Sequence, residues 1–131
     1  MSTILPDTSI WIDFFRGNDA AWSLNQLIED GLIVTNDLVL AELIPSIESK
    51  GEHDLRELMY SVQKVDLTID WERIIEMQQT CLATGFNNVG IPDLIIAQNA
   101  LDHGLTLFEN DKHFRPMTDL FGVKLFRGSN S

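Results

Sequence analysis

Four acidic residues that lie far apart along the chain are its best candidates for joint chemistry: Asp7, Glu42, Asp93 and Asp111. Ionised carboxylates repel one another in a small site, so such a group needs either a shared proton or a bound cation. Oxygen ligands without a cluster of histidines suit Mg²⁺ or Mn²⁺. A metal site of that kind suits the attack of water on a phosphodiester.

Each of these acids also has a simpler structural interpretation. Asp7 precedes Thr-Ser-Ile-Trp and fits an ordinary helix N-cap. Asp93 fits a first helical turn, where the helix dipole favours an acid, and Asp111 fits a turn. Glu42 is the most informative, because the apolar residues of 38–44 surround it and a carboxylate is costly to bury alone. The alternative for Glu42 is a narrow exposed stripe on a mostly buried helix. The hypothesis therefore depends on the four acids meeting in one place.

Short apolar runs alternate with helical periods, and this alternation predicts an α/β fold with both faces of a mostly parallel, five-stranded sheet covered by helices. We expect strands at 3–7, 32–35, 65–69, 105–108 and 123–126, and helices at 8–16, 19–30, from 37 until Pro45 bends or ends it, near 55–62, at 71–82 and at 92–102. Ligands of such sheets bind beyond the carboxyl ends of the strands. The acids are expected to meet there.

Composition is typical of one globular domain over residues 1–131, with 128–131 expected to fray. The apolar runs are too short to span a membrane, and the first residues lack the pattern of a signal peptide. A single cysteine, Cys81, excludes an internal disulfide. We therefore expect a cytoplasmic protein, with Cys81, Trp11, Trp22 and Trp71 in its core.

The net charge of −11 argues against extensive contact with a polyanion and favours a basic partner or a bound cation. The sequence lacks a glycine-rich phosphate-binding loop, the Gly-x-Ser-x-Gly motif of serine esterases, and cysteines and histidines at the spacing of a zinc site. Phosphate-loop enzymes, serine esterases and zinc proteins are therefore not supported.

Four segments, read in order, resemble the PIN domain and most closely the bacterial VapC-type toxins: 5–16 (LPDTSIWIDFFR), 40–43 (LAEL), 92–100 (PDLIIAQNA) and 110–114 (NDKHF). Each segment alone is weak, but their order and spacing match the family from about residue 3 to 126. The resemblance implies a three-layer α/β/α sandwich with a parallel sheet.

The resemblance also implies a Mg²⁺- or Mn²⁺-dependent endoribonuclease in which activated water hydrolyses RNA. The implied metal-binding and catalytic residues are Asp7, Glu42, Asp93 and Asp111; the implied polar lining is Thr8, Ser9, Glu109 and Asn110; and the implied RNA-binding cations are Arg16, Lys112 and Arg115. For a VapC-type toxin it further implies a homodimer, inhibition of translation by cleavage of RNA (tRNA favoured), and a cognate VapB-like antitoxin that covers the site.

One departure from the family concerns Glu109, which stands where threonine or serine is usual. Residues two apart on a strand share a face, so Glu109 and Asp111 can both point at the site. This leaves open a catalytically weak or inactive PIN-like binding module, which would bind metal without cleaving RNA. A haloacid-dehalogenase-type phosphatase needs an acid at position 9, where Ser9 stands, and a receiver domain needs adjacent acids near the first strand, which are missing.

Overall fold

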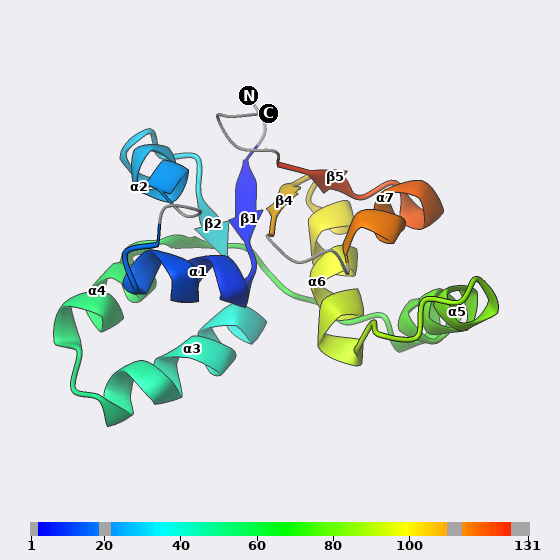
Figure 1. The fold of residues 1–131 in the computed structure, drawn as a ribbon, viewed down its shortest axis with the longest axis horizontal. Helices are drawn as coiled ribbons and strands as arrows, with labels where there is room; N and C mark the ends of the chain where they lie inside the picture. Colours follow the sequence, from blue (N-terminus) through cyan, green and yellow to red (C-terminus); the bar gives the residue numbers. More distant parts are fainter. Residues whose placement is uncertain (1–2, 19–21, 110–113, 127–131) are drawn as a thin grey trace.

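Parallel strands form the centre of the fold in this computed structural model, which describes residues 3–18, 22–109 and 114–126 (Figure 1). One sheet has the order β1-β4-β5, with β1 at Ile4–Pro6, β4 at Thr106–Phe108 and β5 at Lys124–Leu125; a second pairs β2 (Val34–Thr35) with β3 (Gln63–Lys64). Every one of these pairings is parallel. A parallel bridge from Ile4 to Ile33 joins the two sheets. The predicted parallel α/β fold is confirmed, although its five strands are hydrogen-bonded as three and two.

Seven helices surround the strands in the described residues: α1 (Thr8–Phe15), α2 (Trp22–Glu29), α3 (Asp37–Ser49), α4 (His53–Ser61), α5 (Trp71–Ala83), α6 (Ile91–Asp102) and α7 (Arg115–Phe121). In Figure 1, α1–α4 lie on one side of β1 and α5–α7 on the other. Within the described part of the chain, none of these helices is long and apolar enough to cross a membrane.

The core lies between the strands and two inward-facing helices. Leu5 of β1 and Leu107 of β4 are fully buried, and α3 buries one stripe of Val39, Leu43 and Ile47. Helix α6 is buried at every position from 94 to 100, so it is the central helix of the fold. Cys81 and Trp11 are core residues, as predicted. The side chain of Trp22 and residues 128–131 lie outside the part of the chain that the structure describes.

The third strand was predicted wrongly. It lies at Gln63–Lys64, not at 65–69, and both of its residues are exposed. The only trace of the predicted strand among the described hydrogen bonds is the N–H of Val65, which donates to the carbonyl of Thr35 over 2.9 Å. Short apolar runs were the basis of the strand predictions, and a strand whose two side chains are polar and exposed carries no such run.

Three further details go beyond or against the sequence prediction. Of the two outcomes predicted at Pro45, a bend or an end, the end is excluded, because α3 continues to Ser49. Helix α7, with Pro116 in its first turn and a left-handed Gly122 (φ +77°) at its end, was not predicted. Trp71 is 56% exposed rather than in the core, because α5 packs through its opposite face.

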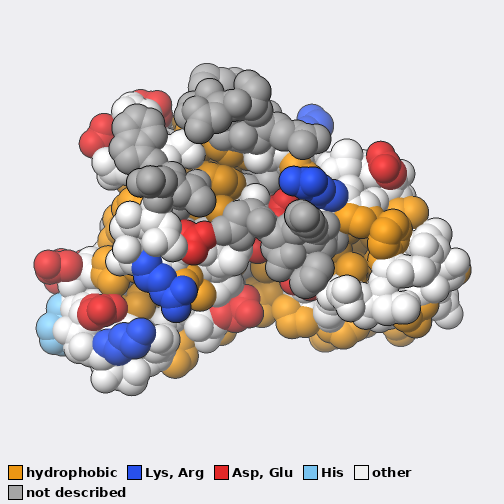
Figure 2. Space-filling model, in the orientation of Figure 1, with side chains coloured by type: hydrophobic (Ala, Val, Ile, Leu, Met, Phe, Trp, Pro, Cys, Tyr) orange, Lys and Arg blue, Asp and Glu red, His pale blue; other side chains and the backbone are white. Residues whose placement is uncertain are grey.

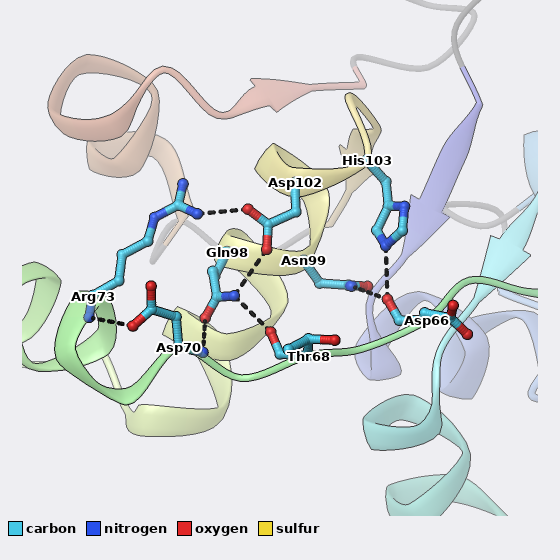
Figure 3. Close-up of polar contacts among 8 residues, drawn as sticks. All are labelled: Asp66, Thr68, Asp70, Arg73, Gln98, Asn99, Asp102 and His103. Atoms are coloured by element: carbon cyan, nitrogen blue, oxygen red, sulfur yellow. Dashed lines mark hydrogen bonds and ion pairs between the residues drawn. The ribbon is translucent and has the colours of Figure 1, made fainter.

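A polar network fixes α6 against the segment that precedes α5 (Figure 3). The side chain of Gln98 accepts from the N–H of Asp70 (3.1 Å) and donates to the carbonyl of Thr68 (2.8 Å) and to the carboxylate of Asp102 (2.9 Å). Both the carbonyl and the amino group of this buried amide are therefore satisfied.

Asn99 makes the longer-range links of the same helix. Its Nδ2 donates to the carbonyl of Asp66 (2.9 Å), and its Oδ1 accepts from Asn36 Nδ2 (2.8 Å). Asn36 is the N-cap of α3, where its Oδ1 accepts from the N–H of Val39 (2.9 Å). Both asparagines are buried. One chain of hydrogen bonds therefore fixes the start of α3 against the middle of α6.

We predict that Asn99→Leu lowers the free energy of unfolding by about 2–4 kcal/mol, because it leaves the buried Asn36 amide without its partner and removes one of the two donors, Asn99 and His103, to the Asp66 carbonyl. Urea denaturation with an unchanged slope measures this effect. The matched control, Gln79→Leu on the exposed side of α5, should change stability by no more than about 0.5 kcal/mol. Equal stability of the two variants would refute the role of this network.

Candidate active site

Asp7 lies where β1 ends and α1 begins. Its N–H donates to the carbonyl of Phe108 (2.9 Å), which joins the carboxyl ends of β1 and β4. Its Oδ1 accepts from Ser9 Oγ (2.6 Å) and from the N–H of Ile10 (3.2 Å). The predicted N-cap is confirmed. The same residue is only 7% exposed, which is far more buried than a cap requires.

Burial raises the pKa of Asp7 to about 6, with a further upward contribution from the negative charge of Asp93, and the hydrogen bonds from Ser9 and Ile10 oppose this rise. Asp7 and Asp93 therefore lie close enough to repel each other. The ion pairs among the described residues join Arg56 to Glu48, Lys64 to Asp37 and Arg73 to Asp102, and none of them includes either acid. No described lysine or arginine neutralises this pair of carboxylates.

Asp93 lies in the first turn of α6, after Pro92. Its Oδ2 accepts from the N–H of Gly90 (3.1 Å), which forms the half of a capping box that a glycine N-cap allows. This hydrogen bond fixes the direction of the carboxylate, and the rigid, buried helix behind it fixes its position.

Glu42 is exposed, so the argument that an apolar helix would force it into the interior is wrong. Only one stripe of α3 is buried, and Glu42 lies beside that stripe. Its Oε1 instead accepts from Thr8 Oγ1 over 2.8 Å. Because Thr8 directly follows Asp7, this bond ties Glu42 to the same end of the sheet.

The structure thus places Asp7 near Asp93, as the effect of the Asp93 charge on the pKa of Asp7 indicates. It also places Glu42 next to Thr8, to which it is hydrogen-bonded. Asp111, Asn110 and Lys112 lie outside the described residues. Within the described part of the chain, no three His, Cys, Asp or Glu side chains form a ready-made metal site. The chemistry of the donors still fits a hard divalent cation, since a buried, repelled carboxylate gains most from one.

The other candidates take different places. Glu109 follows β4 and is half-buried, with its Oε2 shielded from solvent. Arg16 caps the C-terminus of α1 and Arg115 begins α7, and both are exposed. Asn36 was missed as a positioning residue, although an asparagine before Asp-Leu-Val is an ordinary N-cap pattern that could have revealed it.

A family model described as PIN domain matches residues 4–120. Three solved structures share the fold: a toxin–antitoxin complex from Klebsiella pneumoniae (22% identity, TM-score 0.69, 92% of this chain and 95% of that chain), VapBC2 from Rickettsia felis bound to a promoter DNA fragment (19%, 0.70, 95% and 97%), and FitAcB from Neisseria gonorrhoeae (19%, 0.72, 95% and 97%). A search of curated proteins gave no match. With most of its length matched by the family model, the chain belongs to the PIN domain family.

Proposed function

We propose that this chain is a metal-dependent endoribonuclease. The observation that carries the proposal is the burial of Asp7 beside Asp93, at the carboxyl edge of a parallel sheet, with no described cation to neutralise them. A protein tolerates such repulsion where a bound ion or a substrate relieves it. Membership of the PIN domain family supports the same function.

In this proposal Asp7, Glu42, Asp93 and Asp111 hold Mg²⁺ or Mn²⁺, directly or through water. When bound, the metal supplies activated water and offsets negative charge near the phosphodiester. Ser9 orients Asp7 through its 2.6 Å hydrogen bond, and Thr8 orients Glu42. Arg16, Lys112 and Arg115 are the cations proposed to bind RNA phosphates.

We further propose that the chain is the toxin of a toxin–antitoxin pair, acting in the cytoplasm as a homodimer. Three of the structural neighbours are described as toxin–antitoxin or VapBC complexes. The net charge of −11 also suits a basic protein partner such as a VapB-like antitoxin. Cleavage of RNA, with tRNA as the favoured substrate, would then inhibit translation.

Glu109 favours a second candidate, a PIN-like module that binds without cleaving. A half-buried carboxylate directly after β4 adds negative charge beside the proposed site. This module would bind metal and leave RNA intact.

The nuclease is tested with purified tRNA and total RNA, in Mg²⁺ or Mn²⁺ and in EDTA. We expect discrete cleavage that requires metal and falls by about 100-fold or more in Asp93→Asn, because that change removes a charge from the reacting centre. Asp30→Asn, an exposed acid after α2, is the matched control and should cleave normally. Metal binding with intact RNA in every protein would establish the binding module instead.

Thr8 is predicted to be a positioning residue for Glu42. Thr8→Val should lower kcat by about 10-fold, since a hydrogen bond to a charged group contributes about 1.5–3 kcal/mol. It should also weaken Mn²⁺ binding measured by calorimetry, whereas Thr8→Ser, which keeps the hydroxyl, should restore both. If valine and serine give the same kcat and the same Mn²⁺ affinity, Thr8 does not orient Glu42.

Asp7 is predicted to make the metal-free protein less stable as the pH rises. The protonated carboxyl fits the fold better than the ionised one, so its stabilising effect is complete below about pH 4 and disappears as the pH passes 6. A rise in pKa from 3.8 to about 6 corresponds to about 3 kcal/mol.

Asp7→Asn keeps an N-cap oxygen but carries no charge. In EDTA, its free energy of unfolding should exceed that of the wild type by about 3 kcal/mol at pH 8, with little difference at pH 4. Mn²⁺ at pH 8 should stabilise the wild type alone. If the difference in the free energy of unfolding between the two proteins stays constant with pH, ionisation of Asp7 does not destabilise the fold.

A further inference from the structure

A groove lies between α1 and α3, and it starts at the acidic end of the sheet. Ile12 and Phe15 of α1 form one wall, with Arg16 just after that helix, and Leu43 and Ile47 of α3 form the other, with Lys50 just after it. Glu42, Ser46 and Glu52 complete the lining, and the cavity measures about 190 Å³. That is several times the about 30 Å³ that one water takes in the liquid, so the groove has room for a ring.

Both helices begin near the strand ends and run from there toward the same side of the molecule (Figure 1). They meet at the Thr8–Glu42 hydrogen bond (2.8 Å). Arg16 comes eight residues after Thr8, and Lys50 comes eight residues after Glu42. At a rise of 1.5 Å per residue, both cations stand about 12 Å beyond that hydrogen bond. The groove therefore leads from a proposed catalytic acid to a pair of positive charges.

These two charges are unusual in so acidic a chain. Of its nine lysines and arginines, two (112 and 127) lie outside the described residues. Three of the other seven are held in ion pairs with Glu48, Asp37 and Asp102. Arg16 and Lys50 are two of the four for which the described residues provide no ion pair, and both are exposed at the same groove. Figure 2 shows basic side chains over α1 and the α3–α4 pair beside hydrophobic ones.

The wall between the cations and Glu42 is aromatic and aliphatic. The ring of Phe15 is half-buried and packs against Trp11 and Phe14, with centroids 6.1 Å apart in each case. Trp11 is fully buried, so it supports the Phe15 ring from the core side. Single-stranded RNA is bound by this combination of basic groups for the backbone and aromatic faces for the bases.

A second groove lies between α3 and α4, and it also contains an aromatic ring, that of Tyr60. It is larger, at about 400 Å³, and Lys64 lines it. That lysine is already paired with Asp37 at 3.0 Å, so its charge is compensated within the protein. Glu42 and Glu52 also line the α1–α3 groove, but no ion pair among the described residues holds Arg16 or Lys50. The α1–α3 groove is therefore the one of the two whose cations are free to meet an anionic strand.

We infer that the α1–α3 groove is the subsite for a nucleotide that flanks the scissile bond of single-stranded RNA. Arg16 and Lys50 bind its phosphate, and Phe15 contacts its base. This inference rests on the proposed nuclease function and extends it to residues of α1 and to Lys50. Both cations also follow helix C-termini, where positive charge stabilises a helix, so each variant requires a thermal melting control.

The test measures binding of a fluorescein-labelled oligouridylate by anisotropy over a range of salt concentrations, with Asp93→Asn as the background to prevent cleavage. Neutralising both cations (Arg16→Gln with Lys50→Gln) should weaken binding by about 10-fold or more. It should also reduce the salt slope by about 0.7 for each RNA phosphate that the protein no longer neutralises. The matched control, Lys124→Gln on the exposed side of β5, should bind like the background protein.

Two further variants separate the parts of the groove. Phe15→Leu should weaken binding by about 5-fold or more without changing the salt slope, because base stacking involves no counterion release. Glu52→Gln, which removes a negative charge from the rim, should strengthen binding. With Asp93 intact, the double neutralisation should raise KM for RNA more than it lowers kcat.

The outcomes distinguish the subsite from the nuclease. RNA binding that responds to these variants, without any cleavage by the wild type, would support the subsite and reject the nuclease. Cleavage with unchanged KM, affinity and salt slope in the double variant would overturn the subsite and leave the nuclease standing. Absence of both binding and cleavage in the wild type would overturn both.

Discussion

The hydrogen bond between Asn36 and Asn99 is the interaction on which the arrangement of the site depends. It joins residues 63 positions apart and links the first residue before α3 to the middle of α6, the two helices that carry Glu42 and Asp93. The bond is stable because each asparagine has a further partner: the N–H of Val39 for Asn36 and the carbonyl of Asp66 for Asn99. A buried amide with all its groups satisfied specifies one arrangement, since any shift of either helix would leave polar atoms buried and unpaired.

Against this rigid frame, Asp7 is a source of strain. Its carboxyl is buried, close to a like charge, and held in place by Ser9 and Ile10. The bond from the N–H of Asp7 to the carbonyl of Phe108 holds Asp7 at the sheet edge, and the bond from the N–H of Gly90 holds the carboxylate of Asp93. The repulsion between the two carboxylates therefore persists until a proton or a cation relieves it. We therefore expect lower stability near neutral pH than an uncharged residue would give, and the same repulsion underlies the proposal that a divalent ion binds at this edge of the sheet. Strain of this kind is common where a protein binds ligands.

The overall acidity of the chain and its proposed RNA substrate are compatible because charge is distributed unevenly. Three described cations are neutralised by neighbouring acids, whereas Arg16 and Lys50 stand at one groove that begins beside Glu42. Such a protein neutralises few phosphates, so it relies on placement of charge rather than on its amount. A basic partner could then contact the acidic surface outside the groove and leave the groove open.

Local patterns in the sequence determined the parallel α/β class, the N-cap at Asp7, and the position of Asp93 in a first turn. These features depend on residues within one or two turns of each other, so periodicity and capping chemistry are sufficient to predict them. The exposure of Glu42 and Trp71, the position of β3 and the Asn36–Asn99 bond were decided only by the tertiary structure. Which face of a helix is covered, and which distant amide meets another, depends on elements that pack from elsewhere in the chain. The α1–α3 groove belongs to the same class, because its two walls are adjacent only once both helices have docked on the sheet.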